Sequence, residues 1–368
     1  MPGAGDVRWE PAASGPSSGF RNKAKMVVGG TLEQPTLGIL DAGLRGVDLR
    51  DCGLHEPALR AALPVLAELV TRARLTPYDV AARRGELKHL IVTVSPDGAL
   101  MVRLVLRSTE GLPRVRKQLD WLTGRLPVAV LSVNLQPEHK AVLEGPEEIV
   151  LTAQETLPMR LGALTLHLRP QGFFQTNTAM AARLYATARA WTDHLAPRSV
   201  LDLYCGVGGF ALHLAAPGRR VHGLEISADA VRAARRSAAE AGLAATFAVG
   251  DAVAEPWGGG VGDERQGPDG PGPWDLVVVN PPRRGLGEGL CARLRAERPG
   301  AILYSSCSPA SLARDLTALG GPSAGAGGPR GYRPVRAQVV DLFPQTAHAE
   351  VLVLLEPTPP VGAGQRPG

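Results

Sequence analysis

Residues 200–210, Val-Leu-Asp-Leu-Tyr-Cys-Gly-Val-Gly-Gly-Phe, are the segment that decides the fold. Apolar residues running up to Asp202 are typical of the end of a buried parallel strand. Three glycines, Gly206, Gly208 and Gly209, then predict a tight turn into an Ala- and Leu-rich helix. A strand, a glycine turn and a helix form the first unit of a doubly wound α/β domain, whose ligands bind over the carboxyl ends of the strands. The segment therefore predicts a Rossmann-like domain, which we place at 161–357.

The spacing around this turn also indicates the kind of cofactor. A second predicted strand, 220–224, ends in Glu225, where a carboxylate is placed to accept hydrogen bonds from a ribose diol. The Gly-x-Gly-x-x-Gly spacing of dinucleotide sites is absent, and no Gly-Lys-Ser/Thr phosphate loop follows. The spacing Asp-x-x-x-Gly-x-Gly-Gly suits a nucleoside without a pyrophosphate. S-adenosylmethionine is the usual ligand of this kind, and we expect it here.

Composition limits the class of protein. The 368 residues have room for two domains, and their formal net charge of +5 permits an anionic partner such as RNA. No run of about eighteen apolar residues and no export signal is present, so we expect a cytoplasmic protein without membrane contact. The four cysteines are scattered and predict neither a disulfide framework nor a zinc site. Nothing in the sequence indicates a protein partner.

The N-terminal half predicts an α+β domain over 20–160, which carries no catalytic constellation and is expected to bind RNA. Within the strand expected from residue 20, Arg21, Lys23 and Lys25 alternate with apolar neighbours. Such a basic face can follow a phosphate backbone, although an exposed edge strand protected by cations would show the same pattern. Gly-, Pro- and Ser-rich composition predicts three flexible segments. These are the lead 1–19, an insertion at 258–273 and the tail 358–368.

Two polar segments flank predicted elements of the C-terminal half. Gln175 and Asn177 follow a pair of phenylalanines, and together they would grip a flat ligand or simply begin a helix. Asn280 ends a predicted buried strand, and the two prolines that follow hold it at the strand tip. Amino-group methyltransferases have an aromatic residue after such prolines. Here Arg283 takes that place, which favours a site for another base.

A thiol and a carboxylate complete the predicted site. Cys307 ends a predicted strand at the edge where the ligand lies, and Glu350 precedes an otherwise apolar strand. A carboxylate there is costly unless it is paired or used, whereas His348 is equally compatible with a structural hydrogen bond. Methylation of uracil at C5 needs a thiolate that adds to C6 and a base that removes the C5 proton. Cys307 and Glu350 fit these roles, and the target nucleotide would have to leave its stack.

Six motifs together resemble the RNA uracil-5-methyltransferase family over residues 19–355, most closely its branch that acts on 23S ribosomal RNA. The motifs are Ser-Gly-Phe-Arg-Asn-Lys-Ala-Lys-Met at 18–26, Phe-Phe-Gln-Thr-Asn at 173–177, Asp-Leu-Tyr-Cys-Gly-Val-Gly-Gly-Phe at 202–210, Asn-Pro-Pro-Arg-Arg-Gly at 280–285, Tyr-Ser-Ser-Cys at 304–307 and Phe-Pro-Gln-Thr-Ala-His-Ala-Glu at 343–350. The resemblance implies a nucleophile, a base and a set of ligands for S-adenosylmethionine. The nucleophile would be Cys307, the base Glu350, and the cofactor ligands Gln175, Tyr204, Glu225 and Asn280.

The sequence departs from this family at two places. Ser308 follows the predicted nucleophile, where the family usually has Asn. The branch also has an N-terminal cysteine cluster that holds an iron–sulfur centre, and here only Cys52 resembles one of its ligands. We therefore expect no iron–sulfur cluster in this chain, since one thiolate does not make such a site. Three alternatives stay open: the same reaction on transfer RNA, another S-adenosylmethionine-dependent methylation, and a catalytically silent RNA-binding assembly factor.

Overall fold

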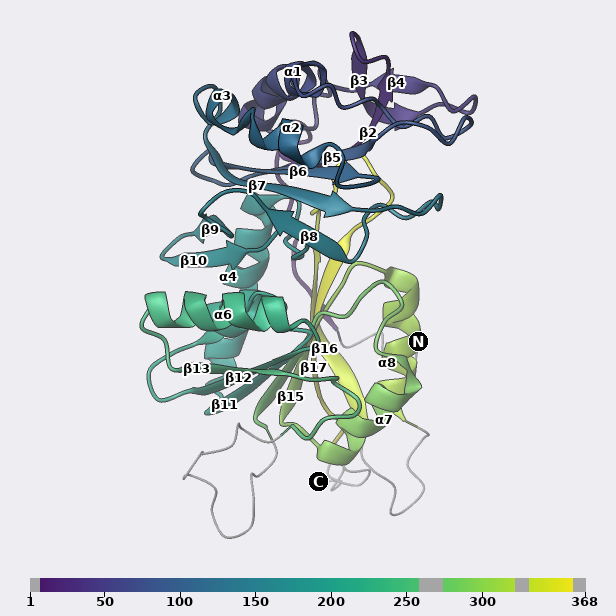
Figure 1. The fold of residues 1–368 in the computed structure, drawn as a ribbon. Coiled ribbons are helices and arrows are strands. Elements are labelled where there is room, and N and C mark those ends of the chain that lie inside the picture. Colours follow the sequence, from purple (N-terminus) through teal and green to yellow (C-terminus); the bar gives the residue numbers. More distant parts are fainter. Residues whose placement is uncertain (1–6, 258–273, 322–330, 360–368) are drawn as a thin grey trace, which may run out of the picture. The chain divides into compact units, whose positions relative to one another are not determined.

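The computed structural model describes residues 7–257, 274–321 and 331–359, and its contacts divide the chain into two compact units. The N-terminal unit is Pro16–Leu161 with His167–Thr178, and the methyltransferase-like unit is Met1–Gly15, Gly162–Leu166 and Ala179–Gly368. Figure 1 labels their helices and strands. The predicted insertion at 258–273 and most of the predicted tail lie outside the described residues, so those two predictions stay untested.

The methyltransferase-like unit contains an eight-stranded sheet in the order β1-β16-β17-β15-β14-β11-β12-β13. The strands are β1 (Arg8–Trp9), β11 (Ser199–Leu203), β12 (Arg220–Glu225), β13 (Ala245–Val249), β14 (Leu276–Val279), β15 (Ala301–Ser306), β16 (Tyr332–Val340) and β17 (Glu350–Pro357). Strands β11 to β15 run parallel, and β17 runs antiparallel between β15 and β16. The strand order reverses beside β11, where doubly wound sheets bind their ligands.

Helices cover both faces of this sheet, with α6 and the pair α7–α8 on opposite sides in Figure 1. The helices are α4 (Thr178–Leu195), α5 (Gly209–Leu214), α6 (Ala228–Glu240), α7 (Gly287–Glu297) and α8 (Pro309–Gly320). Leu201 and Val277 are fully buried in one cluster with Leu290 of α7 and Leu312 of α8. Near-continuous apolar strands of this kind are typical of a parallel sheet covered on both faces. The predicted Rossmann-like class is confirmed.

The expectation of a loose N-terminal lead is wrong for residues 8–13. Strand β1 pairs in parallel with β16, and beyond it the Ala13 amide donates to the Val339 carbonyl at 2.8 Å. Ala13 is buried, and the Arg336 guanidinium donates to Glu10 at 2.7 Å. Composition alone misjudged this segment because the edge of β16 satisfies its backbone groups, and a low apolar content does not prevent such pairing.

The N-terminal unit contains a seven-stranded sheet in the order β4-β3-β2-β5-β6-β7-β8, with α1 packed on one face. Its strands are β2 (Lys23–Gly30), β3 (Pro35–Leu40), β4 (Gly46–Asp48), β5 (Leu87–Val94), β6 (Leu100–Leu106), β7 (Val128–Leu135) and β8 (Glu147–Val150). Its helices are α1 (Pro57–Arg72), α2 (Leu112–Arg116) and α3 (Leu119–Thr123). Strands β9 (Leu157–Leu161) and β10 (Leu164–Leu168) form a separate two-stranded sheet. Leu59, Leu63 and Leu66 of α1 are fully buried against the sheet, as their spacing on one helical face predicts.

Two details of this unit differ from the sequence-based description. Strand β2 lies between β3 and β5, so it is not an edge strand, and of its two lysines Lys23 is buried and Lys25 exposed. Residues 167–178 group with this unit rather than with the domain predicted from residue 161. The Asn22 side-chain amide explains the grouping, because it donates to the Gln175 carbonyl at 2.9 Å and to the Thr178 hydroxyl at 2.7 Å.

Candidate active site

The glycine turn after β11 has the conformation that its sequence predicts. Gly206 and Gly208 have φ angles of 54° and 86°, in the left-handed region that favours glycine. A Cβ atom at Gly209 would lie 2.4 Å from the Tyr185 hydroxyl oxygen, so a side chain does not fit there. Buried Asp202 accepts a hydrogen bond from the Ala211 amide at 2.8 Å and thereby ties the strand to the first turn of α5. Burial raises the pKa of Asp202 to about 8.

Glu225 lies at the carboxyl end of β12 beside this turn. One of its carboxylate oxygens accepts from the Gly206 amide at 3.1 Å, and the other accepts from the Ser227 amide at 2.9 Å. These two bonds fix the orientation of the carboxylate, and each oxygen keeps a lone pair for another donor. The side chain is only partly buried. The arrangement therefore fits the ribose diol of a nucleoside such as S-adenosylmethionine, and half-buried Tyr204 lies within the same turn.

Asn280 follows β14 and connects two parts of the site. Its side-chain amide donates to the Ser305 carbonyl on β15 and to a Glu350 carboxylate oxygen on β17, each at 3.1 Å. Pro281 and Pro282 follow at once, as expected for a residue held at a strand tip. The structure thus joins a residue predicted to bind the cofactor directly to the residue predicted to act as base.

Glu350 is the first residue of β17 and has only 1% of its surface exposed. Its carboxylate accepts from the Asn280 amide and from the Ser305 hydroxyl, and both donors are uncharged. Burial raises the pKa of Glu350 to about 7, while these two hydrogen bonds act in the opposite direction. A carboxyl group with such a pKa can exchange protons at neutral pH, as a general base must.

Cys307 follows β15 directly, so β15 and β17 bring the thiol and Glu350 to one edge of the sheet. Burial raises the pKa of the Cys307 thiol, and the negative charge of Glu350 raises it further. The Arg283 guanidinium contacts the thiol and acts in the opposite direction. Ser308 caps α8, because its hydroxyl accepts from the Ser311 amide at 3.4 Å. Ser and Asn are equally good N-caps, so the departure at this position keeps the loop anchored.

Two further residues, Ser305 and Asp315, shape this edge and carried no role in the sequence analysis. Ser305 donates to Glu350, and its place within the Tyr-Ser-Ser-Cys motif was the available signal. Asp315 of α8 accepts from the Tyr304 hydroxyl at 2.6 Å and from the Leu286 amide at 2.8 Å. It therefore holds the loop that follows Asn280 against β15, and no local pattern indicates this contact.

The remaining predicted residues, which are Gln175, the phenylalanine pair and His348, differ in burial. Gln175 is buried and belongs to the N-terminal unit, so its role toward the cofactor stays a prediction. Of the phenylalanines before it, Phe174 is buried and Phe173 is exposed, so the pair does not act together as core. His348 is exposed, and its backbone amide donates to the Thr346 hydroxyl at 3.2 Å.

The residues that the structure describes contain neither a metal-binding cluster nor a membrane-spanning helix. Within 7–257, 274–321 and 331–359, no group of three or more His, Cys, Asp or Glu side chains is placed to hold a metal ion. Cys52 is half-buried with a free thiol. No helix in the described part of the chain has the length and apolar character needed to cross a bilayer.

A doubly wound sheet, a glycine turn without dinucleotide spacing after its first strand and an acidic residue after its second are typical of the class of S-adenosylmethionine-dependent methyltransferases. A family model described as "Methyltransferase domain" matches residues 200–261. The protein "23S rRNA (uracil(747)-C(5))-methyltransferase RlmC" from Halothiobacillus neapolitanus is 49% identical to this chain, and the match covers 96% of this chain and 90% of that protein. A protein of the same name from Pectobacterium carotovorum is 46% identical, with coverage of 95% and 88%. The chain belongs to the RlmC family of 23S rRNA uracil-C5-methyltransferases.

A solved structure shows the same fold over nearly the whole chain. It is the crystal structure of Pyrococcus abyssi tRNA (uracil-54, C5)-methyltransferase in complex with S-adenosyl-L-homocysteine. The two chains are 25% identical and superpose with a TM-score of 0.75, covering 95% of this chain and 78% of the other. The family indicated by the six sequence motifs is thereby confirmed.

Proposed function

We propose that this chain methylates C5 of a uridine in 23S ribosomal RNA, with Cys307 as the nucleophile and Glu350 as the general base. The observation that carries the proposal is the edge of the sheet after β15, where the Cys307 thiol lies under the influence of the Glu350 carboxylate and the Arg283 guanidinium. The 23S substrate is inferred from the names of relatives that are 46–49% identical. We keep the expected cytoplasmic location as part of this proposal, since ribosomal RNA is modified there in bacteria.

Each residue has a definite task in the proposed reaction. The Cys307 thiolate forms a bond to C6 of uracil, and the electron pair of the C5–C6 double bond moves onto C5 and O4. Once C5 carries its methyl group, the Glu350 carboxylate removes the C5 proton. The electron pair then restores the double bond, and the thiolate leaves C6. Arg283 favours the thiolate in the first step, and the pKa of about 7 lets Glu350 act in the second.

The residues of the eight-stranded sheet that would hold the cofactor are Tyr204, Glu225 and Asn280, and the family resemblance adds Gln175. S-adenosylmethionine supplies an electrophilic methyl group when it is bound. The free lone pairs of the oriented Glu225 carboxylate are the feature that fits its ribose. Asn280 already donates to Glu350, so the same side chain holds the base in place next to the proposed ligand.

The proposal is tested with 23S ribosomal RNA transcripts that contain 5-fluorouridine, incubated with the protein and S-adenosylmethionine. A base cannot remove fluorine from C5, so the reaction should stop at a covalent protein–RNA adduct. We expect mass spectrometry to place the adduct on Cys307 and to find none in Cys307→Ala. Cys52→Ala is the matched control, since Cys52 is the other half-buried thiol of the described residues, and it should form the adduct normally.

Three outcomes decide between the alternatives. An adduct that forms with transfer RNA but not with 23S RNA would reject the proposed substrate and keep the chemistry. No adduct with either RNA, despite binding of both RNA and S-adenosylmethionine, would reject Cys307 as the nucleophile. Glu350→Gln should trap ordinary uridine as an adduct, because without the base the methylated uracil stays attached to the thiol.

A further inference from the structure

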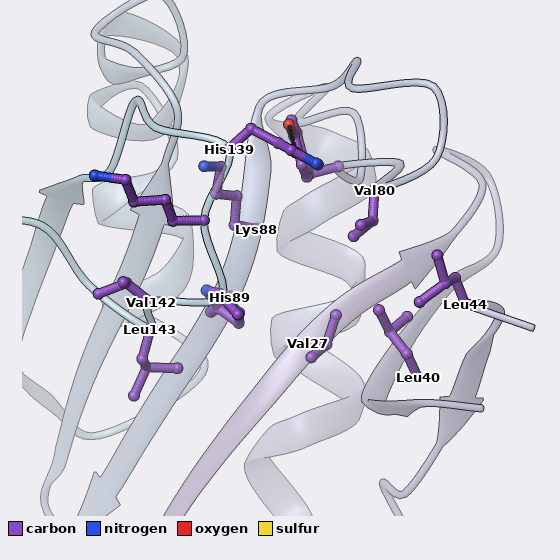
Figure 2. A pocket seen from close by; sticks show the side chains of 12 residues that line it. Val27, Leu40, Leu44, Val80, Lys88, His89, His139, Val142 and Leu143 are labelled. Atoms are coloured by element: carbon purple, nitrogen blue, oxygen red, sulfur yellow. Dashed lines mark hydrogen bonds between the residues drawn. The ribbon is translucent and has the colours of Figure 1, made fainter. Parts of the chain in front are cut away.

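The N-terminal unit contains a cavity of about 520 Å³ that none of the proposed catalytic residues lines. Figure 2 shows its side chains. Val27 of β2 and His89 of β5 are a cross-strand pair and contribute neighbouring side chains on one face of the sheet. The hairpin that joins β3 to β4 adds Leu40 and Leu44. A cavity of this size, lined mainly by apolar side chains, is within the range of small-ligand sites.

The opposite wall carries the polar and aromatic groups. The Lys88 ammonium donates to the Gln136 side-chain oxygen and to the Glu138 carbonyl at 2.6 Å, and it lies 4.8 Å from the centre of the Tyr78 ring. The Tyr78 hydroxyl is hydrogen-bonded to Nδ1 of His139 at 2.9 Å. An ammonium group has three protons, so one proton of Lys88 is left for a ligand. Buried Lys88 thus holds this wall in place and has one N–H group that can donate to a ligand.

The charges around the cavity favour an anionic ligand. No acidic side chain is among the twelve lining residues, which include both Lys88 and Lys140. Outside the lining, Glu138 pairs with Lys140 at 2.6 Å, Glu144 acts on His89 and Arg107 acts on Lys88, so three cations face two carboxylates. Burial and the charge of Lys88 lower the pKa of His89 to about 4, so this ring is neutral near pH 7. The cavity therefore combines an uncharged apolar part with a cationic wall.

A further cation lies next to the cavity along β2. Lys25 and Val27 are two residues apart and therefore point to the same face of the sheet, roughly 7 Å apart along the strand. Lys25 pairs across the sheet with Ile91, just as Val27 pairs with His89. Because Lys25 is exposed, it can contact a phosphate beside a ligand that occupies the cavity.

We propose that this cavity binds one unstacked base of the RNA substrate, with the adjoining phosphates held by Lys25 and Lys88. Single-stranded RNA is recognised by splayed bases that pack on aromatic and apolar side chains while cations contact the backbone. The Tyr78 and His139 rings both line the cavity and are tilted by 47°, so they do not stack on each other. This inference rests on the proposed function, because it assumes that RNA is the substrate.

The test measures the affinity of the full chain for a fluorescent single-stranded RNA across a range of salt concentrations. Leu44→Ala combined with Val142→Ala removes two exposed side chains from the cavity rim, which are 49% and 50% accessible to solvent. We expect about ten-fold weaker binding with an unchanged salt dependence, since the loss is apolar. Lys25→Ala should also weaken binding, and it should lower the salt slope by about 1.

The matched control is Ile39→Ala with Val47→Ala. These side chains lie on β3 and β4 next to the same hairpin and are 53% and 38% exposed, but they do not line the cavity. Their loss should leave RNA affinity unchanged. Photocrosslinking with RNA that contains 4-thiouridine should in addition yield a labelled peptide with Tyr78 or His139.

Two results would overturn the inference, and they are distinguishable. The first is an unchanged RNA affinity of the rim variant while 5-fluorouridine RNA is still trapped on Cys307. This result would reject the cavity as an RNA-binding site but keep the proposed function, and the cavity would then bind a different partner, such as an apolar peptide. Absence of RNA binding by the unaltered chain would reject the cavity and the proposed function together.

Discussion

Two carboxylates, one in each unit, have opposite environments: Glu350 is buried and Glu148 is half-buried. Glu350, at the edge of the eight-stranded sheet, accepts hydrogen bonds only from the uncharged donors Asn280 and Ser305, and burial raises its pKa to about 7. Glu148, on β8 of the seven-stranded sheet, accepts two hydrogen bonds from the Arg103 guanidinium at 2.9 and 2.5 Å. Burial acts against its charged form too, but Arg103 prevails and the pKa of Glu148 is lowered.

The difference separates a structural carboxylate from one prepared for proton transfer. A buried ion pair keeps both partners charged at all physiological pH values and is costly to break. A buried carboxyl group without a cation is held near the point where it gains or loses a proton. A glutamate side chain therefore has a structural role in the seven-stranded sheet, as Glu148, and in our proposal a catalytic role in the eight-stranded sheet, as Glu350.

The largest expected effect is on turnover in Glu350→Gln. Loss of the general base should lower the multiple-turnover rate of RNA methylation by about 100- to 10,000-fold, because the methylated RNA stays on Cys307, while the fold is retained. Incorporation of labelled methyl groups measures the rate, and circular dichroism checks the fold. Glu356→Gln on the same strand is the control and should be fully active, since Glu356 lies at the far end of β17. Equal losses in both variants would contradict the special role of Glu350.

The second expected effect is on the pH dependence of stability. The pKa of Glu350 is raised from 4.5 to about 7, so between these pH values the unfolded chain gives up the proton first. Stability contributed by the neutral carboxyl group is present below pH 4.5 and is lost as the pH rises through 7, by about 3 kcal/mol.

Urea denaturation of the native protein and of Glu350→Gln, at pH 5 and at pH 8, isolates this contribution. Asp202 also has a raised pKa, but it is present in both proteins, so its effect cancels in the comparison. The variant should gain stability relative to the native protein between pH 5 and pH 8. A constant difference would show that Glu350 titrates with an ordinary pKa.

The third expected effect is a loss of stability in Glu148→Gln, which removes the ion pair between Glu148 and Arg103. Arg103 is 2% exposed and would keep only Glu144, whose side chain is 32% exposed, so we expect a loss of about 2–3 kcal/mol. The loss should grow as the pH rises from the lowered pKa of Glu148 to its ordinary value of 4.5 and stay constant above it, the reverse of the Glu350 case. The exposed pair Asp97–Arg160 is the control, and Asp97→Asn should leave the urea midpoint unchanged.

The smallest expected effect is on the reactivity of Cys307. Glu350→Gln removes the negative charge that raises the thiol pKa, and Arg283→Ala removes the positive charge that lowers it. Alkylation of Cys307 by iodoacetamide at pH 8 should become about two- to ten-fold faster in the first variant and slower in the second. Arg284→Ala, a neighbouring change, should keep the native rate. If Glu350→Gln and Arg283→Ala changed the alkylation rate in the same direction, electrostatic control of the thiol would be contradicted.

Sequence patterns predicted the parts of this protein that depend on neighbouring residues. The glycine turn at 206–209, the acidic end of β12, Asn280 before two prolines and Cys307 at the end of β15 all lie where their local patterns placed them. Strand periodicity and turn geometry extend over only a few residues, so they are encoded locally. The ordered motifs also sufficed to indicate the family, because each is tied to one strand end.

Contacts between distant segments were decided by the tertiary structure alone. Asn280 and Glu350 are 70 residues apart and meet because β17 inserts antiparallel beside β15, an arrangement that no local pattern specifies. The same holds for β1 on the edge of β16 and for Arg103 with Glu148. Hydrogen-bond partners and burial depend on strand order and direction. Every pKa described above depends in turn on these partners and on burial. The sequence by itself determined which side chains arrive at the edge of the sheet, and the tertiary structure determined which of them are left without a counter-charge.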